Sequence, residues 1–200
     1  MTLSRVVFIL GLAVAVRAGA LMAQDDRLAT RLSPQLAAQV QVVVDSAAAA
    51  GLPTEPLIDI ALEGAAKGAT SDRILAAVRR MDDNLRVAQQ QLGAGSDATE
   101  LVTGAHALRQ GLAPQRLASL RAARPEGSLQ VLLATLLELV ARGVPTGSAD
   151  RVIESLSSQA SDADFRAFLV EVDQAIGAGQ DAESAAVSAS QRVLRRTPPP

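Results

Sequence analysis

The sequence predicts an all-α protein made of two tandem copies of a multi-helix unit, packed as a small α-solenoid or a curved helical bundle. Three observations support this. The segment LIDIALEGAAKG at 57–68 has a close counterpart, LLATLLELVARG, at 132–143. Apolar residues recur at helical spacing between glycine and proline breaks. Alternating runs of β-branched residues, which would indicate strands, are missing.

Composition sets broad limits on function. The 200 residues are 48% apolar, which is enough for one ordinary core. Net charge is −2, so the basic face needed for nucleic-acid binding is not expected. There is no Cys, Trp or Tyr, so no disulfide can form and aromatic stacking platforms are scarce. We interpret the excess of arginine over lysine as the mark of a GC-rich genome rather than of a selected arginine surface.

Residues 1–23 have the layout of a secretory signal peptide. Arg5 precedes an apolar run at 6–16, and small residues follow Arg17. This run is shorter than the roughly 20 residues that span a bilayer. We expect cleavage after Ala20 or Ala23 and a periplasmic or secreted protein; the alternative is an uncleaved inner-membrane anchor. The polar residues 24–33 are predicted to be a flexible neck.

The first copy is predicted at 34–110. Its first helix starts with Ser33 as N-cap and Pro34 at the first helical position, and ends at Gly51. A second helix, ending at Gly68, has an apolar side made of Leu57, Ile58, Ala61, Leu62 and Ala65. The third and longest helix carries a seam with alternating steps of four and three residues, formed by Ile74, Val78, Met81, Leu85, Ala88 and Leu92. Asp97 opens a fourth helix.

The second copy is predicted at 111–196, followed by a disordered tail at 197–200. A short helix at 116–123 precedes a leucine-rich one, and a capping pattern at Ser161 and Asp164 starts a helix with Phe165 and Phe168 on one face. The last helix, 182–196, is predicted to be an end cap. Matching segments are 75, 78 and 84 residues apart, so we expect the insertions to lie at turns. The matches are AKG with ARG, DRIL with DRVI, and GAGSDA with GAGQDA.

Glu63 and Glu138 occupy matching positions and are the first candidates for chemistry. Pseudo-symmetry could bring them together as an acid–base pair. Each also stands four residues before a basic residue, Lys67 or Arg142, in the order that favours an exposed ion pair on a helix. We favour the exposed pairs.

Other clusters also have plausible structural explanations. His106 is the only histidine and lacks the His or Cys partners typical of metal sites, so a partly exposed helix position is expected. The turns at 93–95 and 177–179 superficially resemble phosphate loops, but Asp97 and Asp181 should cap the amides that a phosphate would need. The acidic residues Asp162, Asp164, Glu171 and Asp173 lack the pattern of a calcium loop.

Three arginines near the C-terminus, Arg192, Arg195 and Arg196, could contact an anionic membrane or glycan, with a weak and salt-sensitive attraction.

The sequence therefore assigns no catalytic, cofactor-binding or metal-binding residue. The leading hypothesis is an exported, non-enzymatic helical-repeat protein that binds a protein or peptide in the bacterial cell envelope. The alternative is a carrier of a small apolar ligand or lipid between the helical copies, and a third is an enzyme using Glu63, Glu138 and His106. We expect no nucleic-acid partner, and membrane contact only if the leader stays uncleaved.

Overall fold

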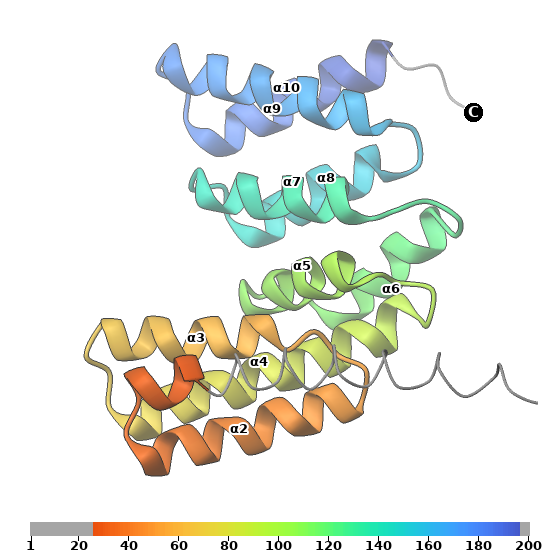
Figure 1. The fold of residues 1–200 in the computed structure, drawn as a ribbon. Helices are drawn as coiled ribbons and strands as arrows, with labels where there is room; N and C mark the ends of the chain where they lie inside the picture. The colour runs from red at the N-terminus through yellow and green to blue at the C-terminus, as the bar shows by residue number, and fades with distance from the viewer. Residues whose placement is uncertain (1–25, 197–200) are drawn as a thin grey trace, which may run out of the picture. The chain divides into compact units, whose positions relative to one another are not determined.

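The computed structural model describes residues 26–196, and every regular element in this range is a helix (Figure 1). The predicted signal peptide at 1–23 and the tail at 197–200 lie outside the described residues. A short helical segment at 26–31 comes first. It is followed by α2 (Pro34–Ala49), α3 (Glu55–Ala66), α4 (Ser71–Leu92), α5 (Ala98–Arg109), α6 (Pro114–Ala123), α7 (Gln130–Ala141), α8 (Thr146–Ser157), α9 (Asp162–Gly177) and α10 (Ala182–Arg196). The all-α prediction is confirmed.

The chain divides into two compact units between Asp82 and Asp83, within α4. We call the described residues before this point unit 1 and those after it unit 2. The continuous helix α4 therefore contributes residues to both units.

Unit 1 is built on α2, α3 and the first part of α4. The Ser33 hydroxyl accepts a hydrogen bond from the Leu36 amide at 3.4 Å, and Gly51 closes α2 with a φ of 72°, as the sequence predicts. The core of this unit contains Leu36, Val40, Val44, Ala47, Leu57, Ile58, Ala61, Ile74, Leu75, Val78 and Met81.

The segment predicted to be a flexible neck is helical over 26–31. Leu28 and Leu32 lie four residues apart, on the same side of one helical turn, and both are buried. Burial of these two side chains explains why a segment that looks polar along its length is ordered.

The seam predicted for the longest helix is confirmed. α4 has 22 residues, and all six seam residues are buried, namely Ile74, Val78, Met81, Leu85, Ala88 and Leu92.

Unit 2 arranges its helices in two layers. In one layer α7 packs against both α5 and α9, and in the other α8 contacts α6 and α10. Successive helices α7 and α8, and α9 and α10, also pack together, which joins the layers (Figure 1). Fully buried side chains fill the space between them, including Leu117, Leu132, Leu133, Leu136, Ile153, Leu156, Phe165 and Phe168.

The helices of unit 2 follow a regular spacing. α5, α7 and α9 begin at residues 98, 130 and 162, so each begins 32 residues after the one before, and α6 and α8 begin at 114 and 146. Gly111 and Gly143 stand at matching places with φ of 93° and 91°, and each ends the first helix of a pair. The last pair is longer, because α9 has 16 residues where α5 and α7 have 12.

Two of the sequence matches between the predicted copies are not structurally equivalent. Within the first GAG turn Gly93 takes the positive φ, of 88°, whereas in the second α9 runs through Gly177 and Gly179 takes it, at 91°. α4 and α8 each begin three residues after a glycine, Gly68 or Gly143, so the turns are equal in length. The three-residue insertion expected in this turn therefore lies within α8, and that prediction was wrong.

Candidate binding site

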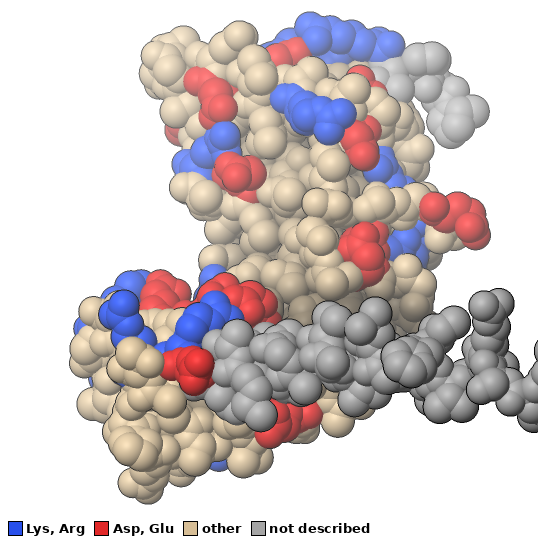
Figure 2. Space-filling model, viewed as in Figure 1, with Lys and Arg blue, Asp and Glu red and all other residues tan. Residues whose placement is uncertain are grey.

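A groove of about 690 Å³ lies in unit 1. One side is lined by the helical segment 26–31, through Asp26, Arg27, Thr30 and Arg31, and the floor is formed by the C-terminal half of α3, through Leu62, Glu63, Ala65 and Ala66. Figure 2 shows acidic and basic side chains next to one another on this unit. Its volume is typical of ligand pockets, although it is open to solvent.

The floor of the groove continues the apolar face of α3. Leu57, Ile58 and Ala61 on this face are fully buried. Leu62 and Ala65, which the sequence places on the same face, are only half-buried, because the helical segment 26–31 leaves the end of α3 uncovered. The apolar side predicted for this helix is therefore only partly covered at the groove.

Two of the four charged residues that line the groove, Arg27 and Glu63, form ion pairs with residues outside its lining. Arg27 donates to both carboxylate oxygens of Glu55, at 2.7 and 3.0 Å, and this contact raises the pKa of Arg27. Lys67 donates to Glu63 at 2.5 Å. The other two charged lining residues, Asp26 and Arg31, carry opposite charges, so the lining has no net charge.

The two candidate carboxylates pair with basic residues, as the sequence predicts. Glu63 bonds Lys67 of the turn that follows α3, and Glu138 accepts from Arg142, just past the end of α7, at 2.5 Å. The two glutamates belong to different units and remain more than half exposed, at 57% and 56%. Each is therefore explained by a pair at a spacing of four residues.

His106 lies half-buried in α5, as expected. Burial, and next the nearby positive charge of Arg109, lower its pKa below the ordinary 6.5. Within residues 26–196 no group of three or more histidine, aspartate and glutamate side chains is arranged to hold a metal ion.

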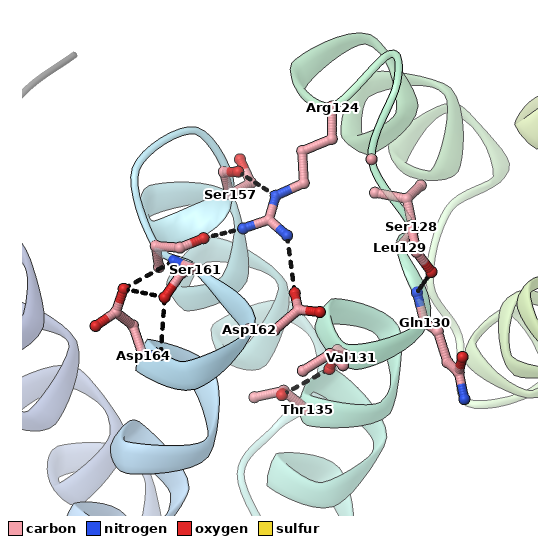
Figure 3. Close-up of polar contacts among 12 residues, drawn as sticks. Arg124, Ser128, Leu129, Gln130, Val131, Thr135, Ser157, Ser161, Asp162 and Asp164 are labelled. Atoms are coloured by element: carbon pink, nitrogen blue, oxygen red, sulfur yellow. Dashed lines mark hydrogen bonds and ion pairs between the residues drawn. The ribbon is translucent and has the colours of Figure 1, made fainter.

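The acidic residues of α9 point to separate partners. Asp164 forms a capping box with Ser161, as predicted, while Asp162 pairs with Arg124 at 3.4 Å (Figure 3). Asp173 and Glu171 bond Arg142 and the arginines of α10, respectively. The four carboxylates therefore do not form one calcium site.

Two of the three C-terminal arginines are engaged by Glu171. It accepts from Arg192 at 2.7 Å and from Arg196 at 2.6 Å, while Arg195 is exposed. These ion pairs reduce the charge available to an anionic surface.

The turns that resemble phosphate loops are capped by aspartate, as predicted. The Asp97 carboxylate accepts from the Glu100 amide at 2.8 Å, and the Asp181 carboxylate accepts from the Ser184 amide at 3.0 Å. The amides that would bind phosphate are therefore occupied.

The buried carboxylate of Glu100 was not predicted from the sequence. Its Oε2 accepts from Arg121 at 2.6 Å, and its Oε1 accepts from the Leu129 amide at 2.5 Å, at the start of α7. Arg121 also donates to the Gly127 carbonyl at 2.7 Å. A polar pocket of about 400 Å³ adjoins this pair, but both side chains already hold the connection between α6 and α7.

Arg124 forms a second polar link that sequence reasoning missed (Figure 3). Its Nε donates to the Ser157 carbonyl at 2.7 Å, its Nη2 donates to the Ala160 carbonyl, and its guanidinium carbon lies 5.3 Å from the centre of the Phe165 ring. The side chain thereby binds the C-terminal end of α8 to the start of α9. Genome composition can explain how many arginines the chain has, but not this placement.

Comparison with protein-family models, with curated proteins and with solved structures found no significant match. Among the described helices, none combines the length and the apolar character needed to cross a membrane. Any assignment of function therefore has to come from the geometry and the sequence.

Proposed function

We propose that this protein is an exported, non-enzymatic helical scaffold that binds a protein or peptide partner. The observation that carries the proposal is the 32-residue spacing of helix pairs in unit 2. Stacked helix pairs of this kind form α-solenoids, and equivalent outward positions line up into an extended binding surface. This spacing supports repetition of the helix pair better than it supports the longer duplication expected from the sequence. The longer duplication stays a prediction.

The outward side of α7 and α9 is well suited to such a surface. Ala134, Ala163, Ala167 and Val170 are exposed there, and Val170 is 55% exposed. Figure 2 shows that the face of unit 2 turned to the viewer is mostly uncharged, with basic and acidic groups scattered over it. Small, uncharged side chains allow close approach of a partner at a low desolvation cost.

The proposed export is supported only by the leader sequence. The periplasmic or secreted location follows from the signal-peptide pattern at 1–23, and cleavage would leave a chain that begins at Leu21 or Gln24. Fractionation of cells that express the tagged full-length chain, with the intact mass of the product, tests this part separately.

The groove in unit 1 is the basis for a second candidate function, the binding of a small apolar ligand. Its floor offers Leu62, Ala65 and Ala66. Covering one leucine and two alanines contributes about 2–3 kcal/mol, whereas association costs a free ligand roughly 4–15 kcal/mol of lost freedom. The scaffold is therefore the better supported proposal.

A photo-crosslinking amino acid at position 134 or 167 tests the proposed surface. The matched control carries it at Ala122, an exposed position on α6, in the other layer. We expect one crosslinked envelope protein from 134 and 167, competed by excess unlabelled protein, and none from 122. Equal labelling from all three positions, or no competed product in folded protein, would overturn the proposal.

A further inference from the structure

A second groove, of about 270 Å³, lies between α8 and α10 in unit 2. Its lining residues recur at i, i+3, i+4 and i+7 on both helices, beginning at Ser148 on α8 and at Val187 on α10. This spacing selects one side of each helix over about two turns, or roughly 10 Å. Because α8 and α10 pack side by side, the groove follows the helix axes, which is the direction in which a third helix packs.

The groove is open at positions where an arginine bridges the preceding pair of helices. Arg116, the third residue of α6, reaches α8 and bonds Asp150 at 3.0 Å and Glu154 at 2.9 Å. The corresponding positions, counted from the starts of α8 and α10, hold Ser148, Ala186 and Ser190. These short side chains leave a space between α8 and α10 that the arginine fills between α6 and α8.

The hydroxyl groups that line the groove are already hydrogen-bonded. Ser155 and Ser190 each donate to the backbone carbonyl three residues before them, at 2.7 and 2.8 Å. Ser148 donates to Glu183 at 2.5 Å. An apolar guest would therefore leave none of these hydroxyls without a partner, so the cost of covering them is small. Val187, which is 40% exposed, adds an apolar side chain for the guest to cover.

The charges that face the groove are two arginines and one glutamate. Of the described residues that line it, Arg151 alone is charged, and its side chain is 71% exposed. Arg151 donates to Ser148 at 2.9 Å and lies 3.9 Å from Glu183, which Ser148 also engages. Arg195 is exposed and follows Leu194, at the other end of the groove. Donors of Arg151 thus remain for an acidic residue of the guest.

We infer that this groove receives an amphipathic helix of a partner protein. The apolar residues of that helix recur at i, i+4 and i+7 and cover Val187 and Leu194, and an acidic residue beside them bonds Arg151. An extended segment would place unpaired amides and carbonyls against the groove, whereas a helix satisfies its own. The inference does not rest on the surface proposed for α7 and α9, because the groove lies in the other layer.

A library of helical peptides serves as the probe. Alanine-based peptides of about 15 residues, long enough to be partly helical alone, carry randomised positions on one face and are selected by display against the folded full chain. We expect enriched peptides to carry Leu, Ile, Val or Met at i, i+4 and i+7, with Asp or Glu beside them. Fluorescence anisotropy then measures the affinity of single peptides for the chain and its variants.

Val187→Asp should weaken binding of the enriched peptides at least about tenfold, because it places a charge on the apolar rim. Val42→Asp is the matched control, the same change at a valine of α2 that is 69% exposed, and it should leave binding unchanged. Arg151→Glu should weaken binding about threefold for peptides with the acidic residue, and not for versions with glutamine in its place. If Val187→Asp lowers helix content, Gln191→Asp replaces it.

Three results would overturn the inference. The first is the absence of enriched peptides, or enriched peptides whose affinity survives Val187→Asp, in protein with unchanged helix content. The second is a dimer that Val187→Asp dissociates in sedimentation equilibrium, since it would assign the groove to a second copy. The third is a small molecule retained there in native mass spectrometry. Crosslinking from positions 134 and 167 is read separately, so this inference and the proposed function can fail independently.

Discussion

Arg142, just past the end of α7, binds Asp173 of α9 through two hydrogen bonds, from Nε to Oδ1 at 2.6 Å and from Nη2 to Oδ2 at 3.0 Å. The same guanidinium reaches Glu138 through Nη1 at 2.5 Å. The contact with Asp173, followed by that with Glu138, raises the pKa of Arg142, and the pKa of Asp173 is lowered in return. One side chain thus connects two neighbouring helices of the same layer.

Replacing Arg142 with lysine should weaken this connection slightly. An ammonium group cannot reproduce the two parallel bonds to Asp173, but that carboxylate is 54% exposed, so the expected loss is only about 0.5 kcal/mol of unfolding free energy. Urea unfolding followed by circular dichroism measures it. Arg195→Lys, at an exposed site, is the control and should change nothing. A loss above about 2 kcal/mol would contradict the view that this pair is screened by solvent.

Removing the Glu100 carboxylate should destabilise unit 2 strongly. The Glu100→Ala variant leaves Arg121 without its carboxylate and the Leu129 amide without its acceptor, in a site where the Glu100 side chain is only 4% exposed. Breaking such a pair costs about 3 kcal/mol. Thermal and urea unfolding would report the change. Glu63→Ala removes an exposed ion pair instead and should lower the unfolding free energy by less than about 0.5 kcal/mol. Equal losses of unfolding free energy in the two variants would contradict the role of Glu100 as a buried, stabilising carboxylate.

A side chain at Gly143 should strain the turn between α7 and α8. The φ of 91° lies where an L-residue pays about 1–2 kcal/mol, so Gly143→Ala should lower stability by that amount even though no atom obstructs the new methyl group. Gly177→Ala is the matched control, because Gly177 closes α9 with ordinary helical geometry and open space around it. That variant should be neutral or slightly stabilising. The prediction fails if both variants unfold at the same urea concentration.

Stability should fall as the pH decreases from about 7 to 5, and His106 should account for the slope. Burial and Arg109 lower the pKa of His106 in the folded protein below 6.5. The unfolded chain therefore binds a proton more readily, and stability present above pH 6.5 is lost as the pH falls. Since His106 is the only histidine, His106→Gln should flatten the dependence in this range. An unchanged slope in the variant would point to another group.

Features governed by local rules were predictable from the sequence. The caps at Ser33, Asp97 and Ser161 and the seam of α4 need only short-range spacing, and all are confirmed. The pairs Glu63 with Lys67 and Glu138 with Arg142 belong to the same group, because four residues along a helix fix the neighbour.

What escaped prediction depends on contacts between distant residues. Glu100 occupies the third position of α5, where a glutamate is ordinarily exposed, and only the approach of Arg121 and Leu129 makes it a buried anchor. Leu28 and Leu32 were similarly hidden within a polar segment. The groove could not be foreseen either, since it exists where the helical segment 26–31 stops short of covering α3.

The extra length of α9 breaks the regular spacing of helices in unit 2. Four residues more than α7 add about one turn, or roughly 6 Å, and α10 accordingly starts 36 residues after α8, at residue 182 rather than 178. A further helix pair added at the 32-residue interval would pack against α9 and α10. Because α9 is about one turn too long, the new helices would not align with them as α7 and α8 align with α5 and α6. A design that continued the regular spacing of unit 2 would therefore have to shorten α9 by about one turn.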